Sequence, residues 1–82
     1  MTVKVFTTPD CGFCRVVKAY LEALGVAFEE VDVSADREAA EWLVKSTGTT
    51  GVPLTLFGES EFVLGWQKGQ LDDCLRKFKL IK

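Results

Sequence analysis

Two cysteines separated by two residues, Cys11 and Cys14, are the side chains of this 82-residue sequence whose spacing points most directly to chemistry. They lie between a short apolar segment and a long segment with helical spacing, at a predicted strand-to-helix junction. A Cys-x-x-Cys pair in that position is typical of a dithiol redox site.

The expected chemistry follows from the place of each sulfur. Backbone N–H groups at a helix N-terminus favour negative charge, and cysteines there ionise with a pKa of roughly 3.5–7.5 instead of about 8.5. We therefore expect Cys11 to be the nucleophile at neutral pH. Cys14, one helical turn later, is expected to be partly buried with a higher pKa. It would attack the mixed disulfide that Cys11 forms with a substrate.

Composition limits the classes of protein to which the chain can belong. Its length predicts one domain over residues 1–82. A hydrophobic fraction of 48% and a charged fraction of 27% are typical of a globular domain. The net charge is −2 with acids and bases interspersed, so we expect no nucleic-acid partner. No apolar run reaches 18 residues, so we expect no membrane association.

The start of the chain and the cysteine count indicate a compartment. No charged segment followed by a long apolar stretch precedes the first strand pattern, so we expect no signal peptide and a cytoplasmic protein. In that setting Cys11 and Cys14 are interpreted as catalytic or metal-binding, not as a structural disulfide.

The elements that position the two cysteines follow from the apolar pattern. Alternation and β-branched residues predict strands, and spacing of three and four predicts helices. The predicted order is strand 2–7, helix 13–24, strand 26–33, helix 37–46, a strand through 51–57, strand 61–64 and a last helix after the loop 65–70. The first strand, helix and strand form a βαβ unit with parallel strands.

Individual residues refine these elements. The apolar positions whose spacing predicts the first helix are Phe13, Val16, Val17, Tyr20, Leu21 and Leu24. Asp10 is a candidate N-cap of that helix, with an effect on the Cys11 thiol as the alternative. Gly25 is expected to stop the helix. Arg15 is interpreted as a solvated cation, with contact to a thiolate as the alternative, and Trp42 as a packing residue.

The order of these elements, with Cys-x-x-Cys at the first helix and Val52-Pro53 before the third strand, resembles the thioredoxin fold. At this length the chain is similar to glutaredoxins and small glutaredoxin-like redoxins of the NrdH type. The resemblance implies an α/β fold, βαβαββα, with a four-stranded mixed sheet flanked by three helices. It also implies a cis Pro53 facing the dithiol, and a Val52 backbone that pairs with bound substrate as an added strand.

Other positions match or depart from the family. Phe13 matches the aromatic residue that the family places between its cysteines. Thr8 replaces the lysine typical of glutathione-using glutaredoxins, and Gly51 replaces the threonine before Val-Pro. Gly65 is followed by Trp66 and Gln67 where those proteins have Gly-Gly and an aspartate. We expect five residues to contribute to substrate binding, which are Phe13, Val52, Pro53, Gly65 and Trp66. Trp66 would either cover the site or seal the edge of the core.

The function implied is reduction of protein or small-molecule disulfides by a monomeric dithiol oxidoreductase. No cofactor is expected, because the Cys11 and Cys14 sulfurs carry both electrons. The altered glutathione positions favour a flavoprotein disulfide reductase of the thioredoxin-reductase kind as reductant. Glutathione or another low-molecular-weight thiol is the alternative.

A second class of function is metal or iron–sulfur binding by two such pairs across a dimer. The chain has no histidine and one further cysteine, Cys74, so a single copy lacks four such ligands. Cys74 follows Leu71 by three residues and is expected to pack inward as a small apolar side chain. A regulatory thiol or an intermolecular disulfide is the alternative for Cys74.

Overall fold

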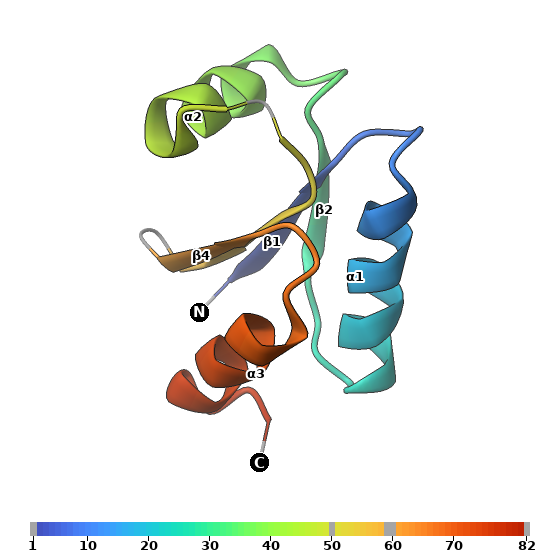
Figure 1. The fold of residues 1–82 in the computed structure, drawn as a ribbon, viewed down its shortest axis with the longest axis vertical. Helices are drawn as coiled ribbons and strands as arrows, with labels where there is room; N and C mark the ends of the chain where they lie inside the picture. The colour runs from blue at the N-terminus through green and yellow to red at the C-terminus, as the bar shows by residue number, and fades with distance from the viewer. Residues whose placement is uncertain (1, 50, 59–60, 82) are drawn as a thin grey trace.

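The chain folds into one mixed sheet with helices on both of its faces (Figure 1). A computed structural model describes residues 2–49, 51–58 and 61–81. Its elements are β1 (Val3–Thr7), α1 (Gly12–Ala23), β2 (Glu29–Asp32), α2 (Arg37–Thr47), β3 (Leu54–Phe57), β4 (Glu61–Leu64) and α3 (Lys68–Lys77). The strand order is β2-β1-β3-β4, with β1 parallel to β2 and the other two pairs antiparallel. The expected βαβαββα fold with three helices is confirmed.

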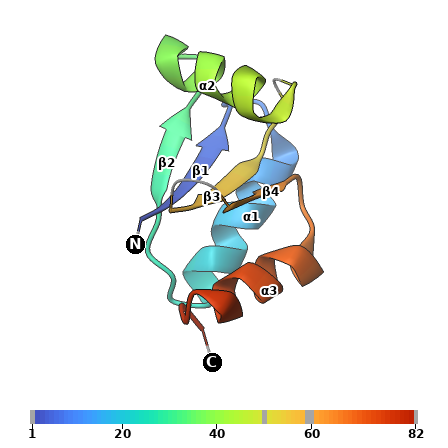
Figure 2. The same cartoon turned by 90° about the vertical axis from the view of Figure 1, so that its left-hand side faces the viewer.

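The two faces of the sheet carry separate apolar clusters. On one face α1 and α3 bury Val17, Leu21, Leu71 and Leu75 against residues such as Val5. On the other face α2 contributes Leu43 and Trp42, whose ring stacks on Phe6 with the centroids 5.2 Å apart. Figure 2 shows α2 apart from α1 and α3. The packing role predicted for Trp42 is confirmed.

The helix predicted from the apolar spacing is confirmed as α1, but three of those apolar residues lie outside its buried stripe. Phe13, Val16 and Leu24 are 61%, 41% and 38% exposed, whereas the buried stripe runs through Val17 and Leu21. Six apolar residues in a row of twelve cover more than one helical stripe, and only the stripe that faces the sheet is buried. Two of the exposed residues, Phe13 and Val16, lie in the first half of α1, close to the cysteines.

Most element boundaries lie near their predicted positions. Gly25, with a φ of 73°, follows the end of α1 as expected. β2 is shorter than predicted, because only Glu29–Asp32 pair with β1. α3 begins at Lys68, inside the predicted loop, where the Leu71 N–H bonds the Gln67 carbonyl at 2.9 Å. Its polar first turn resembles a loop in sequence.

Parts of the predicted turns fall outside the described residues. These are Thr50 in the loop before β3, and Glu59 and Ser60 in the β3–β4 hairpin. In the parts of the chain that the structure covers, no helix combines the length and the apolarity needed to cross a bilayer.

Candidate active site

The sulfur of Cys11 caps the N-terminus of α1. Its backbone is extended, with φ −89° and ψ 113°, and its Sγ accepts the Cys14 N–H at 3.2 Å. The predicted capping role of Asp10 was wrong. The Cys11 N–H bonds the Thr8 carbonyl at 3.3 Å, so Asp10 lies inside that turn, one residue before the helix boundary. A sulfur bonded to a free helix N–H is in a position that favours negative charge.

Cys14 points inward from the first turn of α1 and is 1% exposed. Burial, followed by the hydrogen bond with Cys11, raises the pKa of the Cys14 thiol from 9.0 to about 11. Removal from water disfavours the charged form of a thiol. The expectation of a buried second cysteine with a higher pKa is confirmed, and its burial is nearly complete.

The segment before β3 lies against the first cysteine. The Val52–Pro53 peptide bond is cis, as the resemblance implied. The Cys11 thiol donates to the Val52 carbonyl oxygen, with 3.7 Å between sulfur and oxygen. The backbone of Val52 is therefore beside the sulfur that we expect to react.

A surface hollow of about 390 Å³, here called the apolar hollow, lies beside this segment. It is lined by Phe13, Val52, Pro53, Leu64, Gly65, Trp66 and Gln67. All five residues predicted to bind substrate are in this set, although they come from three separate parts of the sequence. Among the described residues that line it, none carries a formal charge.

The loop between β4 and α3 positions Trp66 in the apolar hollow. Gly65 has a φ of 78°, a left-handed conformation that glycine adopts without steric cost, and its N–H bonds the Pro53 carbonyl at 2.7 Å. The Trp66 ring meets Tyr20 edge to face at 5.3 Å and packs against the core cluster. Trp66 therefore packs at the edge of the core, as one alternative expected, and also lines the hollow.

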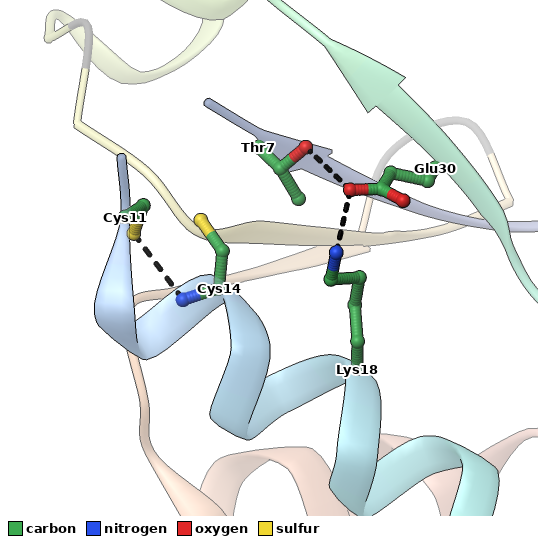
Figure 3. A network of polar contacts seen from close by, with 5 residues as sticks. All are labelled: Thr7, Cys11, Cys14, Lys18 and Glu30. Atoms are coloured by element: carbon green, nitrogen blue, oxygen red, sulfur yellow. Dashed lines mark hydrogen bonds and ion pairs between the residues drawn. The ribbon is translucent and has the colours of Figure 1, made fainter. Parts of the chain in front are cut away.

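A second hollow, here called the polar hollow, lies on the other side of the dithiol. It measures about 370 Å³ and is lined by Thr7, Thr8, Pro9, Cys11, Cys14, Arg15, Lys18, Glu30 and Asp32. Lys18 Nζ lies 2.7 Å from Glu30 Oε2, and the Thr7 hydroxyl donates to the same oxygen at 3.0 Å (Figure 3). Arg15 is exposed and also lines this hollow.

Sequence reasoning missed this network. Glu30 and Thr7 are far apart in the chain and meet only because β1 and β2 pair in parallel. Lys18 carried a readable signal, because it follows Cys14 by four residues and therefore shares its face of α1. The lysine bond and the threonine bond lower the pKa of Glu30, so its carboxylate is charged at neutral pH.

Cys74 lies on α3, apart from the other two cysteines. It is half-buried and packs against the core cluster, as predicted, and burial raises the pKa of its thiol. Within the described ranges, no three cysteine, histidine or carboxylate side chains are grouped so that they could hold a metal ion.

A dithiol at the start of α1, beside a cis-proline segment on a βαβαββα sheet, defines a redoxin of the thioredoxin-like class. The glutaredoxin family profile matches residues 3–62. The chain belongs to the glutaredoxin family, whose members are thiol–disulfide oxidoreductases.

Similar proteins and solved structures agree with the assignment to the glutaredoxin family. Gene 56 protein of Mycobacterium phage L5 is 37% identical over 73 residues, which cover 89% of this chain and 71% of the phage protein. Glutaredoxin 3 of Escherichia coli is 33% identical over 81 residues, covering 90% of this chain and 96% of its own. The structure of Escherichia coli NrdH-redoxin superposes with a TM-score of 0.79 at 27% identity, covering 89% and 93% of the two chains.

Proposed function

We propose that this protein reduces disulfides with Cys11 as nucleophile and Cys14 as resolving thiol. The observation that carries the proposal is the bond from the Cys14 N–H to the Cys11 sulfur at the helix N-terminus. Cys11 attacks a substrate disulfide, one substrate sulfur leaves as a thiol, and a mixed disulfide remains. Cys14 then attacks Cys11, the second substrate sulfur leaves, and the protein holds a Cys11–Cys14 disulfide. The protein loses two electrons and the substrate gains them, without a bound cofactor.

The apolar hollow is the proposed substrate site. An extended peptide placed along Val52 would pair with its backbone, and its side chains would meet Phe13 and Trp66. The uncharged lining suits a protein segment better than a small zwitterionic thiol, because the charged ends of such a thiol need charged or strongly polar partners. Disulfide-containing proteins are therefore the proposed substrates.

A flavoprotein disulfide reductase is the proposed source of electrons. Support comes from the sequence departures at Thr8, Gly51 and Trp66, and from the likeness to NrdH-redoxin, which is described as glutaredoxin-like with a thioredoxin-like activity profile. The alternative is glutathione, which the likeness to Glutaredoxin 3 favours. We further propose that the protein acts as a monomer in the cytoplasm.

A coupled assay separates the two reductants. NADPH oxidation is followed with a protein disulfide substrate, once with thioredoxin reductase and once with glutathione plus glutathione reductase. The proposal predicts turnover at least about tenfold faster with thioredoxin reductase, because the described residues that line the apolar hollow offer glutathione no charged partner. Faster turnover in the glutathione arm would overturn the proposed reductant, and absence of turnover in both arms would overturn the proposed activity.

A further inference from the structure

The resolving step requires a group that stabilises negative charge on a buried sulfur, and the two cysteines do not supply one. Cys14 is 1% exposed, and its sulfur becomes negatively charged as it attacks Cys11. Water does not reach the buried sulfur to stabilise that charge, so a charged or polar group of the protein has to do so. The Cys14 side chain lines the polar hollow, which is formed by α1, by the end of β1 with the residues that follow it, and by β2.

The charged groups around the polar hollow come from these elements. α1 contributes Arg15 and Lys18, and β2 contributes Glu30 and Asp32. The Ser34 hydroxyl and N–H bond the Asp32 carboxylate, which lowers its pKa and engages it away from the thiols. Arg15 also lines the hollow, but it is exposed, so water screens its charge.

Lys18 differs from the other charges in position and in restraint. It follows Cys14 by one helical turn, and both side chains extend from α1 toward the strands (Figure 3). Its side chain is 27% exposed, and its Nζ lies 2.7 Å from the Glu30 carboxylate. Thr7, itself 2% exposed, holds that carboxylate from β1. The ammonium is therefore held in the hollow that the Cys14 side chain also lines, by a carboxylate of β2 that β1 bonds in turn.

We propose that Lys18, held in place by Glu30 and Thr7, stabilises the negative charge on Cys14 during its attack on Cys11 and so sets the rate of the resolving step. This inference rests on the proposed function. Burial raises the pKa of Cys14, and the positive charge of Lys18 acts in the opposite direction, as a group that stabilises the thiolate should. Lys18 acts on the resolving sulfur and not on the first attack.

The step balances without a further reactant. Cys14 loses its proton to the solvent through the polar hollow that its side chain lines, its sulfur bonds the Cys11 sulfur, and the bond from Cys11 to the substrate breaks. The substrate leaves as a thiolate and takes a proton from water. Lys18 remains protonated throughout and transfers nothing. Its contribution is electrostatic, because its ammonium group stabilises the negative charge on the Cys14 sulfur and transfers no proton.

The size of the effect follows from thiol reactivity. An opposite charge close to an ionisable group shifts its pKa by about one to three units. A pKa raised by one unit reduces the thiolate about tenfold but raises its intrinsic nucleophilicity about threefold, so the rate falls by about threefold per unit. Lys18 is also paired with Glu30, so we take the smaller part of that range, about one to two units, and expect loss of the Lys18 charge to slow resolution by about threefold to tenfold at neutral pH.

The aromatic disulfide 5,5′-dithiobis(2-nitrobenzoate) resolves the two steps, because each releases one coloured thiolate. Attack by Cys11 gives the first, and ring closure by Cys14 gives the second. All proteins carry Cys74→Ser, so that only the dithiol reacts. Lys18→Met is compared with Lys18→Arg, which keeps the charge, and with Lys45→Met, which removes a cation from α2 on the other face of the sheet.

We expect Lys18→Met to slow the second phase by about threefold to tenfold and to move its pH midpoint upward, with the first phase changed by less than about twofold. Lys18→Arg is expected to show the second-phase rate and the pH midpoint of the parent protein. Lys45→Met is expected to resemble the parent in both phases. Circular dichroism establishes that each variant is folded, and Lys18→Gln replaces the methionine variant if that one is not.

Two results would overturn the inference or its basis, and they differ. An unchanged second phase and pH profile in the neutral Lys18 variant would show that Lys18 has no such role, while the proposed function stands. Absence of a second phase in the parent protein would instead overturn the proposed function.

Discussion

The backbone N–H of Cys14 points at the Cys11 sulfur, 3.2 Å away. One residue therefore supplies both the capping donor for the first sulfur and the buried second sulfur. In the proposed mechanism the same turn of α1 favours charge on Cys11 and delivers the thiol that displaces the substrate. The spacing of the two cysteines therefore has two effects. It places the Cys14 N–H against the Cys11 sulfur, and it keeps the two sulfurs within reach of each other for the disulfide.

The roles of the two cysteines predict opposite effects of serine substitution. Cys14→Ser is expected to accumulate a mixed disulfide between Cys11 and a protein substrate, because the resolving sulfur is absent. Cys11→Ser is expected to form no adduct and to lose disulfide reductase activity. Intact-protein mass spectrometry detects the adduct, and Cys74→Ser is the control that should behave as the parent. An adduct that forms in Cys11→Ser would reverse the assignment.

Trp66 is expected to contribute to binding of substrate and not to the sulfur chemistry. Trp66→Ala should raise the KM for a protein disulfide by about fivefold to tenfold and change kcat by less than about twofold, because it removes uniform binding in the apolar hollow. Phe62→Ala is the matched control, since Phe62 is an aromatic residue on β4, 38% exposed, outside the hollow.

Trp66 also contacts Tyr20, so thermal unfolding of each variant should accompany the kinetics. A similar rise in KM for both alanine variants, or a loss confined to kcat, would contradict the binding role of Trp66.

Much of this arrangement follows from the sequence, and the exceptions share a physical cause. The cysteine pair, Val52-Pro53 and Trp66 could be found because their types or their spacing are unusual. The network of Lys18, Glu30 and Thr7 could not, because it depends on how α1 packs on the sheet and on how β1 and β2 align, and both are long-range properties. The cap at Cys11 was assigned to Asp10 because aspartate is the commoner cap and a turn position is hard to locate within one residue.

The same reasoning applies to the exposed apolar residues of α1. The spacing of Phe13 and Val16 predicts a helix correctly, but it does not show which stripe faces the sheet. Phe13 lines the apolar hollow instead of entering the core. An apolar residue on the wrong stripe of a helix is therefore a useful indication of a binding surface, once the fold is known.

The buried hydroxyl of Thr55 allows the cost of an unpaired polar group in the core to be measured. Its hydroxyl is fully buried on β3, and in the described part of the chain it has no hydrogen-bond partner. An unpaired buried hydroxyl costs about 1 kcal/mol or more, so Thr55→Val should raise the free energy of unfolding by about 1 kcal/mol in urea. Thr55→Ser is the paired variant, and it should be less stable than the parent because it keeps the hydroxyl and loses a methyl group. A valine variant no more stable than the parent would contradict the assignment of an unpaired group.

The contact between α1 and α3 predicts a dependence of stability on acid. The Tyr20 hydroxyl donates to the Asp72 carboxylate, and Lys68 Nζ lies 2.9 Å from its other oxygen. The tyrosine bond first, and the lysine bond second, hold the pKa of Asp72 below its usual 3.8. A lowered pKa in the folded state means that the stabilisation is present above about pH 4 and is lost as the pH falls through the lowered value.

Asp72→Asn isolates this contribution. The variant should be less stable than the parent at neutral pH, and its urea midpoint should fall less between pH 5 and pH 2, because the other carboxylates are unchanged. Equal acid dependence of the parent and Asp72→Asn would show that the buried carboxylate does not stabilise the fold through its charge.

The central claim is that the Cys11 sulfur, at the N-terminus of α1, makes the first attack on a substrate disulfide and that the buried Cys14 does not. The most direct measurement is the rate of reaction with 5,5′-dithiobis(2-nitrobenzoate) at pH 7 in two variants, Cys14→Ser/Cys74→Ser, in which Cys11 is the one remaining thiol, and Cys11→Ser/Cys74→Ser, in which Cys14 is. We expect Cys11 to react at least about tenfold faster than Cys14, because Cys14 is 1% exposed. A Cys14 thiol that reacts as fast as Cys11, or faster, would contradict the claim.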